Sequence, residues 1–308
     1  MPTKIVQKVK KPIQAKPIII ANWKASTLSY KEAEEKIKNI YKELQKDINK
    51  IDLHIAPTIS QIALLSQYFG GKIEFIKKTK KSKTKSRSKV KPEPLPKVTL
   101  TAQDISIFEG GSKTGEVPVL AAKDAGAVEV IIGHSECRER GDTLEMVVTK
   151  VKLALASNMN VVLCVGEKQR DSGVAYLKVI EEQITSVFSA VDKKDHGRIT
   201  LAYEPVWAIN NKDNISLDAH GLHSMVVSIK KMLLEKYGEA TEKSIKILYG
   251  GSVNGQNAQD IFWNGEVQGL LIGRASFEPK TLVEVIKNIL INPKKNILKT
   301  YGTRKELA

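Results

Sequence analysis

The chain has 308 residues, of which 42% are apolar, and it carries a formal net charge of +15 at pH 7. This length accommodates one large barrel domain or two ordinary domains, and the apolar content is enough for a sizeable core. No apolar run approaches the ~20 residues that span a bilayer, and the lysine-containing N-terminus lacks the apolar stretch of a signal peptide.

Short apolar runs rich in β-branched residues alternate along the chain with segments whose apolar residues recur every three or four positions. This pattern predicts alternating strands and helices. We expect strands at 18–22, 51–56, 98–102, 128–133, 160–165, 199–203, 245–249 and 268–272. We expect helices at 30–47 (with Ser29 as N-cap), 60–68, 117–125, 143–157, 173–191, 216–237, 256–263 and 280–291.

The strand segments are apolar on both faces, which is typical of parallel strands covered by helices. Alternation alone fits both an open doubly wound sheet and a closed barrel. Eight strand–helix units within roughly 275 residues match the usual size of a (β/α)8 barrel. The residues themselves therefore predict an α/β fold with a parallel sheet and leave its closure open.

The positive charge is concentrated in three segments. Residues 1–16 carry five lysines and no acid, residues 77–91 carry nine basic residues and no acid, and residues 293–308 have a net charge of +4, which leaves −3 for the rest. Blocks of like charge usually remain solvated and mobile. The alternative is that they bind an anionic polymer or a membrane surface, but no aromatic residue interrupts 77–91 to stack on bases.

Five of the expected strands end in residues that carry chemistry. Glu204 follows the strand 199–203 and precedes Pro205, which cannot continue a central strand. It is either a general base or a structural polar residue at the rim of the sheet. The other four strand ends are Asn22-Trp23-Lys24, Gly133-His134-Ser135-Glu136, Gly250-Gly251-Ser252 and Gly273-Arg274-Ala275-Ser276.

In this order, these motifs resemble the triosephosphate isomerase family over residues of about 17 to 292. The resemblance implies a single (β/α)8 TIM barrel at 17–292, between a basic N-terminal extension at 1–16 and a C-terminal tail at 293–308. A basic insertion at 77–97 would lie between the second helix and the third strand. Connections of this kind lie at the amino-terminal face of a barrel, away from the chemistry.

The resemblance also implies an activity and the residues that perform it. The expected reaction interconverts dihydroxyacetone phosphate and D-glyceraldehyde 3-phosphate through an enediolate, in glycolysis and gluconeogenesis, without a cofactor. Glu204 matches the catalytic base, and His134 matches a neutral histidine that donates its N–H to the substrate oxygen. Lys24 matches a lysine that binds substrate, and Asn22 matches an asparagine that lines the pocket.

Further residues would bind the phosphate or support the catalytic groups. The glycine turns after the last two strands would supply backbone N–H groups to the phosphate. A lid over residues 205–215 would exclude water, and Glu136 would position its neighbours. Thr114 lies in a polar loop that, in the family, inserts into a neighbouring subunit, so the resemblance implies a homodimer. The expected phosphate-binding residues are Gly251, Ser252, Gly273, Arg274 and Asn210.

The chain departs from the family pattern at several of these places. Asn210 and Lys212 replace glycines of the lid, which puts the closed hinge in doubt. Cys137 replaces an arginine, and Asp142 stands where a glutamate is usual, beside the expected dimer contact, so we expect altered subunit packing there. Arg274 replaces a glycine of the phosphate turn, and its side chain either adds charge near the phosphate or points to solvent.

The composition gives little support for other kinds of site. The two cysteines, Cys137 and Cys164, are too few for a disulfide framework, so we expect buried thiols and a cytoplasmic protein. His220 and His223 form one helical pair without a third histidine, and we expect no metal. A different phosphosugar isomerase on the same scaffold is a further alternative, but the surroundings of Glu204, His134 and Lys24 argue against it.

Overall fold

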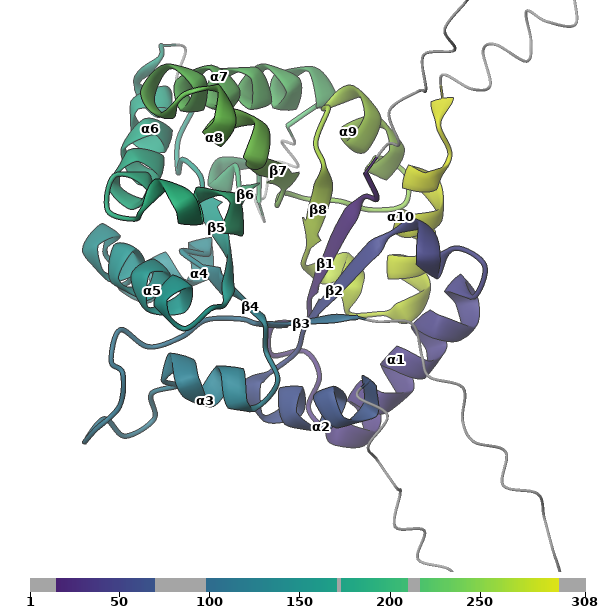
Figure 1. Cartoon of the computed structure of the whole chain (residues 1–308). Helices are drawn as coiled ribbons and strands as arrows, with labels where there is room; N and C mark the ends of the chain where they lie inside the picture. Colours follow the sequence, from purple (N-terminus) through teal and green to yellow (C-terminus); the bar gives the residue numbers. More distant parts are fainter. Residues whose placement is uncertain (1–14, 70–97, 171–172, 210–216, 294–308) are drawn as a thin grey trace, which may run out of the picture.

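The computed structural model describes residues 15–69, 98–170, 173–209 and 217–293. Eight parallel strands form one closed barrel in which each strand pairs with the next along the chain and β8 pairs with β1 (Figure 1). The strands are β1 (Ile18–Asn22), β2 (Asp52–Ala56), β3 (Thr99–Ala102), β4 (Glu129–Ile132), β5 (Asn160–Val165), β6 (Ile199–Tyr203), β7 (Lys246–Tyr249) and β8 (Gly269–Ile272).

Helices surround the barrel as an outer ring (Figure 1). No helix in the described part of the chain is both long and apolar enough to cross a membrane. The α-helices are α1 (Tyr30–Leu44), α2 (Ile59–Phe69), α3 (Val119–Asp124), α4 (Ser135–Glu139), α5 (Leu144–Ala156), α6 (Ala175–Phe188), α7 (Ala219–Tyr237), α8 (Glu239–Ser244), α9 (Ala258–Asn264) and α10 (Pro279–Leu290). The 3-10 helices are η1 (Ile48–Lys50), η2 (Lys193–Arg198), η3 (Val206–Ala208) and η4 (Arg274–Ser276).

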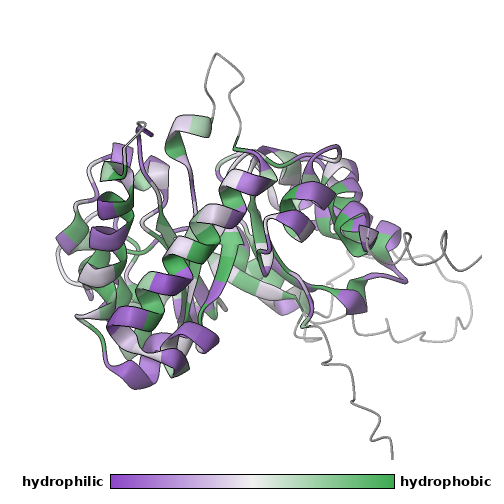
Figure 2. Ribbon diagram, turned by 90° about the horizontal axis from the view of Figure 1, so that it is seen from above, coloured by the Kyte–Doolittle hydropathy of each residue, from purple (hydrophilic) through white to green (hydrophobic). Residues whose placement is uncertain are grey.

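Alternation along the strands creates two separate packing zones, because successive side chains of a strand point to opposite faces. One set, which includes Ile20, Ile131 and Leu248, forms a small cluster that fills the middle of the barrel. The other set, which includes Ile19, Ile132 and Ile247, packs with the helices in a much larger core. Figure 2 shows the strands coloured mostly as hydrophobic and the outer sides of many helices as hydrophilic.

Capping side chains fix where several helices begin. Ser29 accepts a hydrogen bond from the Glu32 N–H at the start of α1, and Thr143 and Asp218 begin α5 and α7 in the same way. Such caps satisfy backbone N–H groups that have no partner within the helix. At the other end of α7, Gly238 adopts a positive φ of 87°, a conformation that favours glycine and ends the helix.

The eight expected strand–helix units are present in the expected order, and the barrel is closed. The expected strands at 18–22, 160–165 and 199–203 have the observed bounds. The first helix ends at Leu44 rather than at residue 47, because the chain turns into η1. The short helix α8 was not expected.

The barrel has polar side chains inside its amino-terminal end. A cavity of about 560 Å³ at this end is lined by the inward-facing Asp52, His54 and Glu129 and by Arg198 and Lys246, among others. His54 Nδ1 lies 2.8 Å from Glu129 Oε1, and both residues are buried. Phe69 and Val98 also line this cavity, so α2 ends and β3 is entered at this end of the barrel.

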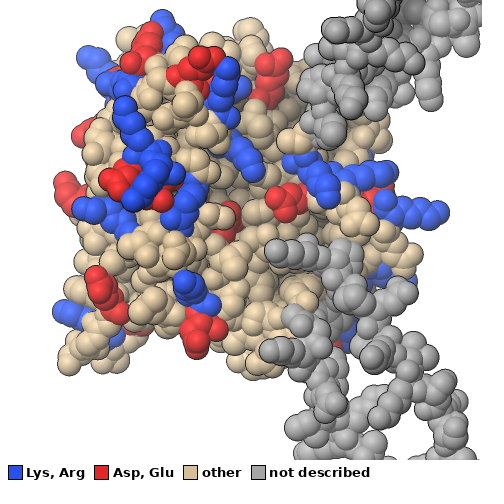
Figure 3. Space-filling view, viewed as in Figure 1, with Lys and Arg blue, Asp and Glu red and all other residues tan. Residues whose placement is uncertain are grey.

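Charges of both signs are interspersed on the face of the molecule shown in Figure 3. This mixture agrees with the small net charge of the chain outside its three basic segments. The expected insertion at 77–97 lies outside the described residues, as do nearly all of the N-terminal extension and the C-terminal tail. The division of the chain into these segments therefore stays a prediction.

Candidate active site

A cavity of about 740 Å³ lies at the carboxyl ends of the barrel strands. Its walls come from the residues that follow β1, β4, β6, β7 and β8, so segments far apart in the sequence meet at one mouth. This is the end of a (β/α)8 barrel where active sites form. The lining includes eight of the expected site residues in addition to Glu204: Asn22, Lys24, His134, Glu136, Gly251, Ser252, Gly273 and Arg274.

Glu204 and His134 are adjacent at the floor of this cavity. Glu204 Oε1 lies 3.4 Å from His134 Nε2, and the two side chains are only 3% and 10% exposed. The other carboxylate oxygen of Glu204 accepts a hydrogen bond of 2.9 Å from the Ser135 N–H. Glu204 is the first residue after β6, and its N–H donates to the Val165 carbonyl, which anchors its backbone to β5.

The backbone of α4 determines the tautomer of His134. His134 is the N-cap of α4, and its Nδ1 accepts a hydrogen bond of 3.1 Å from the Glu136 N–H. A ring nitrogen that accepts cannot also carry a proton, so the ring is neutral and its hydrogen lies on Nε2. The N–H of His134 therefore points toward Glu204 and the cavity, where it is able to donate to a substrate oxygen.

Lys24 brings a cation to the same site from the loop after β1. Its Nζ lies 2.6 Å from Glu136 Oε1, and its backbone N–H donates to Asn22 Oδ1 over 3.0 Å. Lys24 has a φ of 49°, in the left-handed region that is uncommon for residues other than glycine. Burial opposes ionisation of Glu136, but the hydrogen bond and charge of Lys24 outweigh it and lower the pKa of this carboxyl.

Two glycine turns form the remaining wall of the cavity. A Cβ atom at Gly250 would lie 2.8 Å from Glu204 Cγ, so only glycine fits there without displacing Glu204. Gly273 precedes η4, whose Ser276 hydroxyl contacts the carbonyl oxygens of Asn22 (3.2 Å) and Gly273 (2.7 Å). Arg274 begins η4 and is not among the described residues with positive φ, so it replaces glycine without that backbone strain.

Three residues that sequence reasoning did not single out hold these groups in place. Gln103 Nε2 donates to the carbonyls of Lys24 (2.7 Å) and Ala56 (2.9 Å), which fixes the Lys24 loop. Arg138 Nε donates to the Gly133 carbonyl over 2.8 Å, and Ser135 supplies the N–H that holds Glu204. Gln103 follows the end of β3 directly, so its position at a strand end is the signal that would have found it.

The first part of the expected lid is attached to a buried carboxylate. Glu167 Oε1 accepts hydrogen bonds of 2.8 Å from the Tyr203 hydroxyl and from Trp207 Nε1. Trp207 lies in η3, immediately after Glu204 and Pro205. Asn210 and Lys212 lie outside the described residues, so the expectations for them stay predictions.

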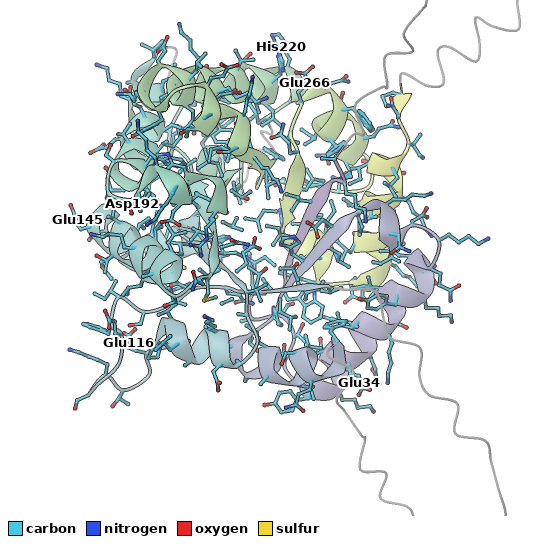
Figure 4. All side chains as sticks on the ribbon, viewed as in Figure 1. Glu34, Glu116, Glu145, Asp192, His220 and Glu266 are labelled. Atoms are coloured by element: carbon cyan, nitrogen blue, oxygen red, sulfur yellow. The ribbon has the colours of Figure 1, made fainter. Side chains whose placement is uncertain are left out.

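Thr114 does not join the cavity of its own chain. It is exposed on the loop between β3 and α3, which projects away from the barrel (Figure 1). Glu116 marks the same loop in Figure 4. Its expected role depends on a second subunit and stays a prediction.

Cys137, on α4, belongs to a small polar cluster. Its sulfur and carboxylate oxygens of Asp104 and Asp142 lie within 4.8 Å of one another. Lys150 Nζ contacts both carboxylates, at 2.8 and 2.6 Å, and offsets part of their charge. Burial raises the pKa of the Cys137 thiol to about 12, which keeps it protonated and a poor metal ligand.

The remaining cysteine and the histidine pair are also accounted for. Cys164 is buried inside the barrel, as expected, and burial raises the pKa of its thiol well above the ordinary value. His223 lies 3.7 Å from Glu266, and Figure 4 places His220 on the outer side of α7, away from the strands.

Comparison with known proteins agrees with this geometry. The sequence profile of the family described as triosephosphate isomerase matches residues 82–289. A triosephosphate isomerase of Chlorobium chlorochromatii is 33% identical over 276 residues, which are 88% of this chain and 97% of the relative. One of Treponema denticola is 41% identical over 192 residues (61% and 75%), and one of Roseiflexus castenholzii is 36% identical over 193 residues (61% and 74%). The chain belongs to the triosephosphate isomerase family.

Proposed function

We propose that the protein is an isomerase that interconverts dihydroxyacetone phosphate and D-glyceraldehyde 3-phosphate, a reaction of glycolysis and gluconeogenesis. The observation that carries this proposal is the pair formed by Glu204 Oε1 and His134 Nε2, 3.4 Å apart in a cavity that Lys24 and two glycine turns also line. The family membership of the chain supports the same reaction over binding to an anionic polymer or a membrane surface.

In the proposed mechanism, Glu204 removes a proton from the carbon next to the substrate carbonyl. His134 donates its Nε2–H to the carbonyl oxygen and stabilises the enediolate that forms. The hydroxyl proton of the enediolate passes from one oxygen to the other by way of His134 Nε2, and Glu204 returns the abstracted proton to the neighbouring carbon, which completes the exchange of ketose and aldose. Lys24 adds positive charge beside the developing oxyanion, and Asn22 holds the backbone of Lys24 through its side-chain oxygen.

The phosphate of the substrate would lie against the two glycine turns. Backbone N–H groups of Gly251, Ser252, Gly273 and Arg274 are the proposed donors, because the turns after β7 and β8 line the same side of the cavity. Asn210 would add a further N–H from the lid. Glu136 has a supporting role, since it pairs with Lys24 and its N–H fixes the tautomer of His134.

A coupled assay tests the reaction directly. Each triose phosphate is supplied separately, and formation of the other is followed through a second enzyme. Wild-type protein is expected to convert both, and Glu204→Asp, which withdraws the carboxylate by one methylene group, is expected to lower kcat by orders of magnitude. Absence of conversion by the folded wild-type protein would overturn the proposal, and undiminished turnover in Glu204→Asp would overturn the role of Glu204.

We also propose that the protein acts as a homodimer in which Thr114 approaches the catalytic groups of the partner. The exposed loop that carries Thr114 supports this, as do Leu28 and Tyr30, two large apolar side chains that are 86% and 55% exposed just after the Lys24 loop. Sedimentation at micromolar concentration is expected to give a dimer. A monomer alone would remove this proposal without affecting the chemistry proposed for Glu204.

Deletion of residues 77–97 tests the proposed position of the basic insertion outside the active site. α2 ends and β3 begins at the amino-terminal end of the barrel, opposite the cavity that contains Glu204. We therefore expect the deletion to leave kcat nearly unchanged, and a large loss would show that the proposed position is wrong.

A further inference from the structure

The charged side chains that line the active-site cavity leave Arg274 as a candidate partner for a dianionic substrate. The described lining contains three carboxylates, Glu136, Glu139 and Glu204, and two cations, Lys24 and Arg274. This balance is negative, whereas a triose phosphate carries a phosphate that is largely dianionic at neutral pH. A negatively charged mouth disfavours such a ligand, and a cation that is not already neutralised would reduce this repulsion in addition to the backbone N–H donors of the glycine turns.

Lys24 is already paired in the absence of substrate. Its Nζ lies 2.6 Å from Glu136 Oε1, and the low pKa of Glu136 keeps that carboxylate ionised. Arg274 is different: it is exposed, and the described residues include no ion pair or side-chain hydrogen bond to it. Among the described cations of the lining, Arg274 is therefore the one whose charge is available to an incoming ligand.

The backbone beneath Arg274 is well anchored. The Ser276 N–H donates to the Gly273 carbonyl over 2.8 Å, and the Ser276 hydroxyl joins the turn to the end of β1. Gly273 also packs closely against Lys24, since a Cβ built there would lie 3.4 Å from Lys24 Cε. The stem of Arg274 therefore begins at a fixed point beside the substrate-binding lysine.

We propose that the guanidinium of Arg274 is a specificity-determining group that recruits and retains the phosphate dianion of the substrate. This inference rests on the proposed function and adds a role for the side chain to the one proposed for the backbone N–H. A guanidinium presents a planar fork of donors that matches a phosphate, and it keeps its charge at any physiological pH. It distinguishes phosphorylated from unphosphorylated trioses because only the former carry the dianion.

The test compares Arg274→Gln with Lys280→Gln. Both remove one exposed positive charge near the start of α10, but Lys280 does not line the cavity. In Arg274→Gln we expect KM for the triose phosphate to rise roughly tenfold at low ionic strength, with a much smaller change in kcat, because the lost interaction is present in both ground state and transition state. The increase should shrink as salt is added, since salt screens exposed charges.

Two further measurements make the test specific. The inhibition constant of inorganic phosphate should rise in parallel with KM, and slow turnover of unphosphorylated glyceraldehyde should change far less. Arg274→Lys should recover part of the lost affinity because it restores the charge without the fork. Lys280→Gln should keep the wild-type KM and its salt dependence.

Several results would overturn the inference. Arg274→Gln with wild-type KM at every ionic strength would do so, and so would a fall in kcat at unchanged KM, which would mean that Arg274 shapes the turn rather than binding phosphate. Equal effects in Lys280→Gln would show a general surface field instead. If wild-type protein converts no triose phosphate, the proposed function fails, and calorimetric binding of inorganic phosphate to wild-type and Arg274→Gln protein still tests the charge of Arg274.

Discussion

Each end of the barrel holds a histidine against a buried glutamate. At the carboxyl end, His134 Nε2 lies 3.4 Å from Glu204 Oε1 in the active-site cavity. At the amino end, His54 Nδ1 lies 2.8 Å from Glu129 Oε1 in the opposite cavity. The residue types, the burial and the position inside the barrel are similar, so the two pairs differ mainly in their surroundings.

The two pairs differ in what faces the ring nitrogen that does not contact the glutamate. In His134 it accepts a backbone N–H, which leaves the ring neutral with a hydrogen directed at Glu204. In His54 it lies 3.4 Å from Asp52 Oδ2, so carboxylates face both nitrogens. Burial opposes protonation of His54, but the charge of Glu129 and the contact with Asp52 outweigh it and raise the pKa of His54 to about 9.

The comparison separates the proposed catalytic pair from a structural one. His54 is an imidazolium at neutral pH, and Thr101 donates a further hydrogen bond of 2.9 Å to Glu129 Oε1, so this pair is a buried ion pair within a polar cluster. Among the residues that the structure describes, no lysine or arginine forms an ion pair with Glu204, and its carboxylate faces an open cavity. Residue type alone therefore does not distinguish the two pairs, whereas the group that faces the other ring nitrogen of each histidine does.

Replacing each of the two glutamates with glutamine should give the largest difference in kcat between the two ends of the barrel. Glu204→Gln removes the proposed base and should lower kcat by roughly 10³-fold or more, while a phosphate-bearing inhibitor still binds with nearly unchanged affinity. Glu129→Gln at the other end should keep kcat within a few-fold. Steady-state kinetics and inhibitor titration check both variants, and a large kcat loss in Glu129→Gln would remove the distinction between the two pairs.

Substitution of the two histidines should also lower kcat much more at the carboxyl end of the barrel than at the amino end. His134→Gln replaces a directed ring N–H with a less well placed amide donor, and we expect kcat to fall by roughly 10²-fold. His54→Gln should change kcat far less. Circular dichroism spectra of the two variants establish that both fold, so that comparable losses of kcat would contradict the assignment of His134.

The free energy of unfolding, in contrast to kcat, should depend strongly on the pair formed by His54 and Glu129. Glu129→Gln leaves the imidazolium of His54 without its main partner, and breaking a buried pair in this way typically costs about 3 kcal/mol of the free energy of unfolding. A double variant, His54→Leu with Glu129→Leu, removes both charges and should recover much of that loss. Urea unfolding measures all three proteins, and equal stability of wild type and Glu129→Gln would show that the pair contributes little.

The pH dependence of stability gives a smaller and more specific effect. The pKa of His54 is higher in the folded protein (about 9) than in the unfolded chain (about 6.5), so its contribution is complete below pH 6.5 and is lost as pH rises through 9. The loss amounts to at most about 3 kcal/mol. The charged residues that line this cavity with it are Asp52, Glu129, Arg198 and Lys246.

Unfolding free energies measured between pH 6 and pH 9.5 check this prediction. The wild-type protein should lose stability over this range, and His54→Leu should lose less. Parallel curves for the two proteins would show that His54 does not titrate as the structure indicates.

The order of elements and most of the candidate site could be predicted from the sequence, because strand ends converge in a parallel barrel. Glu204, His134, Lys24 and the glycine turns each follow a strand directly, so topology alone brings them to one mouth. Helix ends were less predictable. α1 ends at Leu44 because the chain tightens into η1, and apolar spacing does not distinguish that turn from a further helical one.

The groups that depend on tertiary geometry were not predictable. The pair of His54 and Glu129 is separated by 75 residues, and only the barrel brings the two side chains together. Gln103 is intermediate, because its position directly after β3 was a signal, whereas the contacts of its amide with the carbonyls of Lys24 and Ala56 depend on the barrel. Polar residues at alternate positions of β2 and β3 were the available signal, but alternation does not state which face of a strand lines the barrel.

The left-handed backbone of Lys24 has a consequence for engineering of this enzyme. Glycine adopts φ near +49° at little steric cost, whereas a lysine there carries strain of order 1 kcal/mol. Lys24→Gly would relieve that strain, although it would lose the ion pair with Glu136 and the proposed substrate contact. A library selected for thermal tolerance alone would therefore tend to discard this lysine, so thermostability screens of this scaffold need a simultaneous selection for turnover.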